Sequence, residues 1–169
     1  MIVRTVAVFC LGLLSSVAAM AQTAPPSAAP SPSGSELQPP EQQQPGRTFC
    51  EQSVTFHLAD PASVADQYRR FVGIWSDAAW DVRTCAALIV QDVKPDGSAS
   101  IIYVYGPEGS GSAVTGAVLH GTGVIRGDEL RFQNADGSQF AFRPGVVDMV
   151  GHWINPKGES FQATFKQTP

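Results

Sequence analysis

Apolar and polar side chains alternate with a period of two through most of the C-terminal half of this 169-residue sequence. The stretch 98–105 is a clear example, because Ile101, Tyr103 and Tyr105 share one face of it. This period is typical of β-strands, in which successive side chains point to opposite faces of the sheet. The pattern therefore predicts a mostly β domain.

About eight stretches carry this pattern, at 72–75, 84–93, 98–105, 117–125, 130–133, 138–143, 146–154 and 160–166. Most are joined by short turn sequences such as Lys94-Pro95-Asp96-Gly97, and the Gly- and Ser-rich stretch 106–116 is the longest loop. Sequential hairpins of this kind predict an up-and-down antiparallel meander. Because an open meander leaves two unpaired edges, a closed barrel is favoured, with a β-sandwich as the alternative.

One short helix is predicted over 61–71, N-terminal to the meander. Asp60 is a suitable N-cap, Pro61 a suitable first helical residue, and Val64, Tyr68 and Phe71 recur on one face. The alternating stretch 53–58 before it indicates an extra strand or an extended strap.

The first 46 residues are not expected to belong to the fold. Residues 1–21 have the pattern of a cleavable signal peptide: one early arginine, an uncharged apolar run of about 14 residues, and Ala19-Met20-Ala21. Residues 22–46 are rich in Pro, Ala, Ser and Gln and predict a disordered linker, a passive spacer or, alternatively, a docking motif. The sequence thus predicts an exported protein, periplasmic or secreted, with a single domain at 47–169 and no membrane span after cleavage.

Charge and cysteine content narrow the class of protein. Residues 47–169 contain 13 acidic and 10 basic residues, with no basic cluster that would favour nucleic acid. Cys50 and Cys85 predict a disulfide in an oxidising compartment, with two free thiols or half of a metal site as alternatives. No metal-ligand spacing such as CxxC or HExxH occurs, so neither a metal nor a cofactor is predicted.

Gly73-Ile74-Trp75, at the start of the meander and preceded by the helical segment, resembles the Gly-x-Trp signature of lipocalins and their calycin relatives, including the avidin-like proteins. The resemblance implies a small barrel with Trp75 packed across one end. It supports an architecture and does not by itself fix a function.

Aromatic side chains lie on the strands at positions that could all face one interior. They either fill the core or line a cavity entered near the 106–116 loop. The residues predicted to bind a ligand are Trp75, Trp80, Tyr103, Tyr105, Phe140, Phe142 and Trp153.

No catalytic arrangement is recognisable, so the sequence favours a non-enzymatic module that binds a small apolar ligand, a glycan or a partner protein of the cell envelope. An envelope-polymer hydrolase, or an accessory domain of one, is the second hypothesis. Asp77 and Asp81, which flank Trp80 in a predicted connecting loop, or His152 would then act as acid or base. A structural or inhibitor-like barrel with a filled core is the third.

Overall fold

The computed structural model describes residues 46–109 and 113–169. The predicted signal peptide and all but the last residue of the predicted linker lie outside these residues. The described part contains ten strands, β1 Arg47–Phe49, β2 Gln52–Val54, β3 Gly73–Asp81, β4 Thr84–Val93, β5 Ser98–Pro107, β6 Ala117–Arg126, β7 Glu129–Gln133, β8 Gln139–Pro144, β9 Asp148–Ile154 and β10 Ser160–Thr168.

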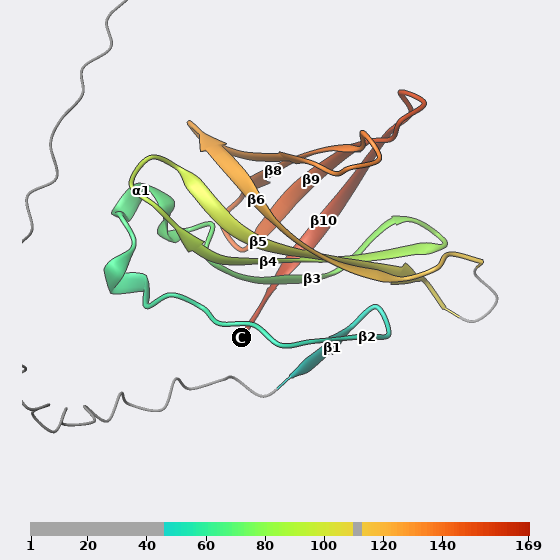
Figure 1. Ribbon diagram of the computed structural model, residues 1–169, viewed down its shortest axis with the longest axis horizontal. Helices are drawn as coiled ribbons and strands as arrows, with labels where there is room; N and C mark the ends of the chain where they lie inside the picture. Colours follow the sequence, from blue (N-terminus) through green and yellow to red (C-terminus); the bar gives the residue numbers. More distant parts are fainter. Residues whose placement is uncertain (1–45, 110–112) are drawn as a thin grey trace, which may run out of the picture. The chain divides into compact units, whose positions relative to one another are not determined.

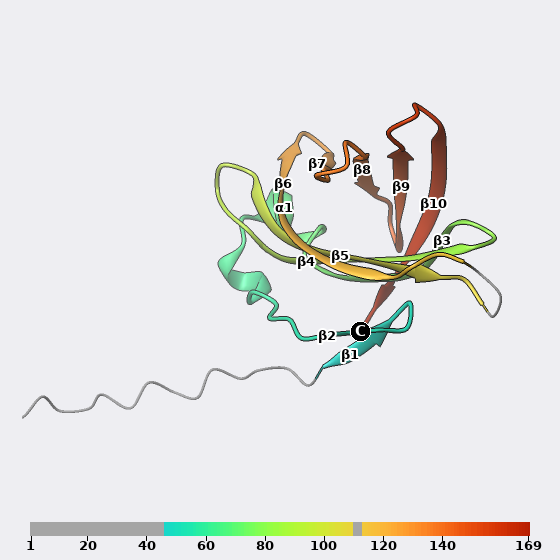
Figure 2. The same cartoon turned by 45° about the vertical axis from the view of Figure 1, so that its right-hand side comes forward.

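Strands β3 to β10 form a closed antiparallel barrel in which each strand pairs with its neighbours in sequence and β10 returns to β3. The predicted eight-stranded meander is therefore confirmed, and the sandwich alternative is not. In Figures 1 and 2, β3 to β6 form a curved layer, and β8 to β10 rise across it. Tight turns join most of the hairpins. At the β4–β5 turn Gly97 has φ +86°, and the Asp96 carboxylate accepts a hydrogen bond from the Ser98 N–H at 2.9 Å.

The predicted helix over 61–71 is present as two short pieces, a 3-10 turn Pro61–Ser63 and the four-residue helix α1, Asp66–Arg69. The predicted N-cap is confirmed, since the Asp60 side chain accepts from the Ala62 N–H at 2.8 Å. The chain becomes extended at Val64 and Ala65, where the Val64 side chain is buried against the barrel core. The helix is thus interrupted at the point where the Val64 side chain enters the core, and neither short piece is long enough to be stable without such packing.

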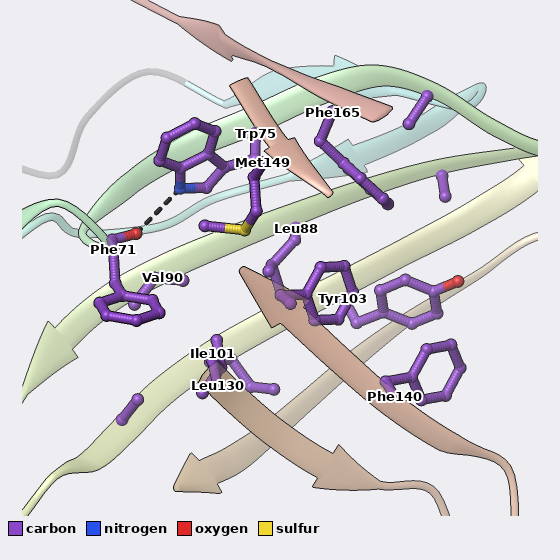
Figure 3. Packing of buried hydrophobic residues seen from close by; sticks show 14 of the residues in the cluster. Phe71, Trp75, Leu88, Val90, Ile101, Tyr103, Leu130, Phe140, Met149 and Phe165 are labelled. Carbon is purple, nitrogen blue, oxygen red and sulfur yellow. Dashed lines mark hydrogen bonds between the residues drawn. The ribbon is translucent and has the colours of Figure 1, made fainter. Parts of the chain in front are cut away.

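The inward-facing side chains of the barrel form one apolar core (Figure 3). Phe71, Phe142 and Phe165 are fully buried in it, and the indole N–H of Trp75 donates to the Phe71 carbonyl oxygen at 2.8 Å. The packing of this core requires glycine at position 151, because a Cβ there would lie 2.7–2.9 Å from the rings of Phe165, Phe142 and Trp80.

The outer face of β4 and β5 is also apolar, which explains why Ala86–Val90 is buried without alternation. A strap made of the β1–β2 hairpin and the extended residues 55–59 covers this face. Val54 and Phe56 of the strap pack with Ile89, Ile102 and other outward residues in a second core. The strap interpretation of 53–58 is thus confirmed, with a short strand at its start.

A disulfide between Cys50 and Cys85 links the strap to β4, as predicted, with the two Cα atoms 5.6 Å apart. Cys50 and Glu51 are the two central residues of the β1–β2 turn, and both have positive φ, 49° and 63°. This is the geometry of a two-residue hairpin turn that Asn-Gly usually occupies. The strap also approaches β5 closely, because a Cβ at Gly106 would collide with the Cys50 carbonyl oxygen.

Candidate ligand-binding site

The strand pairing between β6 and β7 is short, with three residue pairs, as is that between β10 and β3. Strand β5 pairs with β6 at eight positions, whereas β6 pairs with β7 only at Val124, Ile125 and Arg126. Within the described residues, the first part of β6, 117–123, therefore has a partner strand on one side only. Inward-facing side chains near this part of the wall are less completely covered, and Leu119 and Phe132 are only half-buried.

Two adjoining hollows lie among these less covered side chains and the nearby strand ends. The first, of about 250 Å³, has aromatic walls, and we call it the aromatic crevice. Its aromatic residues are Trp80, Tyr103, Tyr105, Phe140 and Trp153. The second, of about 300 Å³, adjoins it at Tyr103 and Asn134 and runs along β6 past Leu119 and Phe132. The crevice is smaller than the cavity of roughly 300–1,000 Å³ that is usual for drug-sized ligands.

The rings of the crevice hold one another in place. Tyr103 and Phe140 have ring centroids 4.8 Å apart, Trp80 and Trp153 5.9 Å, and Tyr103 and Tyr105 6.0 Å. Such contacts are typical of tilted or offset aromatic pairs. The walls are therefore preformed rather than assembled from independent side chains.

Two indole N–H groups at the crevice differ in their partners. That of Trp80 donates to the Tyr103 hydroxyl at 2.6 Å, and burial raises the pKa of this tyrosine well above its usual range, so the hydroxyl stays protonated. The Nε1 atom of Trp153 is buried and has no hydrogen-bond partner in the described part of the chain. Buried donors are usually paired, so this N–H is the least satisfied polar group of the site.

Polar residues form the rim of the crevice. Thr84 comes from the start of β4, and Asn134, Asp136 and Ser138 come from the β7–β8 turn. The Asp136 carboxylate already accepts from the Ser138 N–H at 2.9 Å and from its hydroxyl at 3.0 Å. The sequence predicted this turn but gave no sign that it borders a cavity, because the fold alone brings it beside β4 and β5.

Five of the seven residues predicted to bind a ligand line the crevice, and two do not. Trp75 lies beside Phe71 and Met149, away from Phe140 (Figure 3), and its indole N–H is already bonded within the core. Phe142 is fully buried against Trp80, with ring centroids 6.2 Å apart. Both are core residues and do not line the crevice.

The carboxyl groups that were predicted to act in acid–base catalysis do not line a common cleft. Asp77 and Asp81 lie within β3 and not in a loop after it, and Trp80 between them is buried in the barrel. Asp77, with φ +55°, sits at an irregularity of β3 and lines an outer hollow beside Phe49 and Cys50. Asp81 does not line that hollow.

Asp81 is the last residue of β3. Its carboxylate accepts from the Arg83 N–H at 2.8 Å. Partial burial raises its pKa, but hydrogen bonds from Arg83 and Thr84 outweigh this effect and lower it overall. A carboxyl that stays ionised is a poor general acid. His152 is exposed on the outside of the barrel, as its position in the alternation predicted.

Among residues 46–109 and 113–169, no group of three or more His, Cys, Asp and Glu side chains is placed to hold a metal ion. Over the same residues no helix is long and apolar enough to cross a membrane. Comparisons with protein-family models, with curated proteins and with solved structures found no match. The class of protein is therefore defined by its architecture alone: an eight-stranded antiparallel barrel with a disulfide-bonded strap and a crevice lined by aromatic rings.

Proposed function

We propose that this protein is an exported, non-enzymatic binding module that holds a small ring-shaped ligand in the aromatic crevice. The observation that carries the proposal is a preformed aromatic hollow lined by Trp153, whose buried indole N–H has no hydrogen-bond partner among the described residues. A ligand with a hydrogen-bond acceptor would satisfy this donor, while the neighbouring rings stack on its apolar surface.

The dimensions restrict the occupant to something small. A hollow of about 250 Å³ with aromatic walls and an Asn, Asp, Ser and Thr rim suits one ring that is apolar on its faces and polar at its edge. A single pyranose, or the terminal sugar of a glycan, has this character, as does a small heteroaromatic base. Behind the crevice, the fully buried rings of Phe142 and Phe165 pack against Trp80, so we expect the ligand to stay at the mouth of the crevice.

Export is part of the proposal. The signal-peptide pattern of residues 1–21 supports it, and so does the Cys50–Cys85 bond, since stable disulfides are typical of oxidising compartments. The lipocalin- or avidin-like relationship also remains a proposal, supported by the closed meander and by the position of Gly73-Ile74-Trp75 at its first strand.

The test is a saturation-transfer NMR screen of the purified domain against monosaccharides, N-acetylated monosaccharides and small heteroaromatic bases. We expect at least one compound to bind, and Trp153→Phe to weaken its binding by about three- to tenfold, because a smaller phenyl ring remains for stacking and the indole N–H donor is lost. Tyr105→Phe tests the exposed edge of the crevice. Tyr68→Phe is the matched control on α1, outside the crevice, and should leave binding unchanged.

A screen without binders, together with native mass spectrometry that finds only the unliganded mass in protein from its own host, would favour the structural barrel with a filled core. Binding that Trp153→Phe leaves intact would contradict the role given to the indole N–H.

A further inference from the structure

A second hollow, which we call the outer groove, lies on the outside of the barrel over β6 to β9. It has a volume of about 620 Å³, and its outward-facing residues include Val124, Glu129, Arg131, Arg143, His152 and Ile154. The strand register brings these side chains together. Val124 of β6 pairs with Arg131 of β7, Arg131 pairs with Ala141 of β8, and Ala141 pairs with His152 of β9.

Glu129 fixes two arginines at the groove. Its side chain is 9% exposed, and each carboxylate oxygen accepts from a different guanidinium: one from Nε of Arg131, the other from Nε of Arg143 at 2.6 Å. Burial raises the pKa of Glu129, but the two arginine hydrogen bonds outweigh this effect and lower it, so the carboxylate is ionised at neutral pH.

The arginines keep much of their binding capacity. A guanidinium has five N–H donors, and the contact through Nε engages one of them. The side chains of Arg131 and Arg143 are 68% and 58% exposed. Two positive charges share one negative charge here, so the group carries a net positive charge although the domain as a whole is acidic.

Apolar surface accompanies this charge. Val124 and Ile154, two of the few large apolar side chains exposed in the described residues, both line the groove, with 38% and 41% exposure. Solvent-exposed apolar side chains beside oriented arginines are typical of sites for amphiphilic anions.

We propose that the outer groove binds an organic anion, a carboxylate or phosphate group attached to an apolar portion. Arg131 and Arg143 grip the anionic group, Glu129 positions both guanidiniums, and Val124 and Ile154 contact the apolar portion. The outer groove and the aromatic crevice both touch Phe140, but the charged residues of the groove do not line the crevice, and the proposal does not depend on the function proposed for the crevice.

The test is a titration of the ¹⁵N-labelled domain with phenyl phosphate and with benzoate, followed at the arginine Nε–Hε resonances. Benzyl alcohol serves as the neutral analogue. We expect saturable shifts at Arg131 and Arg143 with at least one of the two anions, and at least fivefold weaker binding of the alcohol. The two anions distinguish phosphate from carboxylate as the preferred group.

Variants separate a built site from general attraction. Arg131→Lys and Arg143→Lys keep the charge but lose the planar fork, and each should weaken binding at least fivefold. Glu129→Gln removes a negative charge, yet it should also weaken binding, because the guanidiniums lose their common anchor. Arg70→Gln, which removes one positive charge from α1's C-cap, is the control and should have no effect.

Shifts that grow linearly without saturation, equal binding of benzyl alcohol, or tighter anion binding by Glu129→Gln would each overturn the proposal. The same spectra report whether each variant is folded. Should Glu129→Gln unfold, the lysine variants decide the question by themselves.

Discussion

Removal of the Cys50–Cys85 bond should destabilise the protein and release the strap, and the size of the effect follows from the loop that the bond closes. The two cysteines are separated by 35 residues, for which the loop-closure relation gives about 4 kcal/mol. In a domain of this size, 1 kcal/mol corresponds to roughly 3–5 °C in Tm. Reduction should therefore lower Tm by about 10–20 °C.

The structure also predicts where the change occurs. Val54 and Phe56 of the strap are buried in the second core. Burial of each side chain contributes about 1.5–3 kcal/mol to the attachment of the strap. The strap is also tied at its far end, where the Ala59 N–H donates to the Gln91 carbonyl oxygen at 2.8 Å. Without the disulfide, hydrogen exchange should accelerate mainly over 46–58, while β7 to β10 keep their protection.

The assay is differential scanning calorimetry with and without reductant, followed by hydrogen-exchange mass spectrometry under reducing conditions. The Cys50→Ser/Cys85→Ser double variant is the control. It should melt near the reduced wild type, and reductant should not affect it. A fall in Tm of less than about 4 °C, or faster exchange spread evenly over the whole barrel, would refute the reasoning.

Four further predictions concern single side chains and are all checked by chemical denaturation. Tyr103→Phe should cost about 1–3 kcal/mol, because it leaves the buried Trp80 N–H without its acceptor, and Trp80→Phe should add less in the double variant than alone. Gly151→Ala should cost about 1–3 kcal/mol or more, since its Cβ would overlap three core rings; a neutral effect would contradict the packing. Glu51→Gly should stabilise by about 0.5–1 kcal/mol, because φ is +63° at this turn position; destabilisation would argue against the turn geometry. Glu129 has a lowered pKa in the folded state, so its ion pairs stabilise the protein above the carboxyl's ordinary pKa, and this contribution is lost as pH falls through the folded-state value. The stability gap between wild type and Glu129→Gln should then shrink on acidification, and a gap independent of pH would be inconsistent with this assignment.

Strand alternation predicted most of the interior from sequence alone. Tyr103, Phe140 and Trp153 face inward as their parity required, and His152 faces outward. Alternation failed where the strand itself is irregular. In β3 the pairing with β4 shifts between Trp75 and Ala78, so the run after Trp75 did not show a strand pattern.

Contacts between side chains on neighbouring strands could not be predicted from the sequence, for a different reason. Glu129 and Arg143 are 14 residues apart, and they meet only because β7 and β8 pair in a particular register. The sequence predicted an extended strap but did not predict that it covers β4. A strand that is buried on both faces has a continuous apolar run, and this run does not identify the segment that covers the strand.

The two proposed sites lie back to back on the β7–β8 hairpin. Phe132 and Phe140 face the interior opening, whereas Arg131 and Arg143 project into the outer groove. Since a slip of one residue in either strand would exchange the two faces, both sites depend on a single register. This hairpin is held to β6 by only three residue pairs, as few as join β10 to β3. A ligand that binds only the native register stabilises it by RT ln(1 + [L]/Kd), wherever on the hairpin it binds. Occupancy of either site should therefore slow hydrogen exchange at β7 and β8, and unchanged exchange at saturating ligand would contradict this dependence.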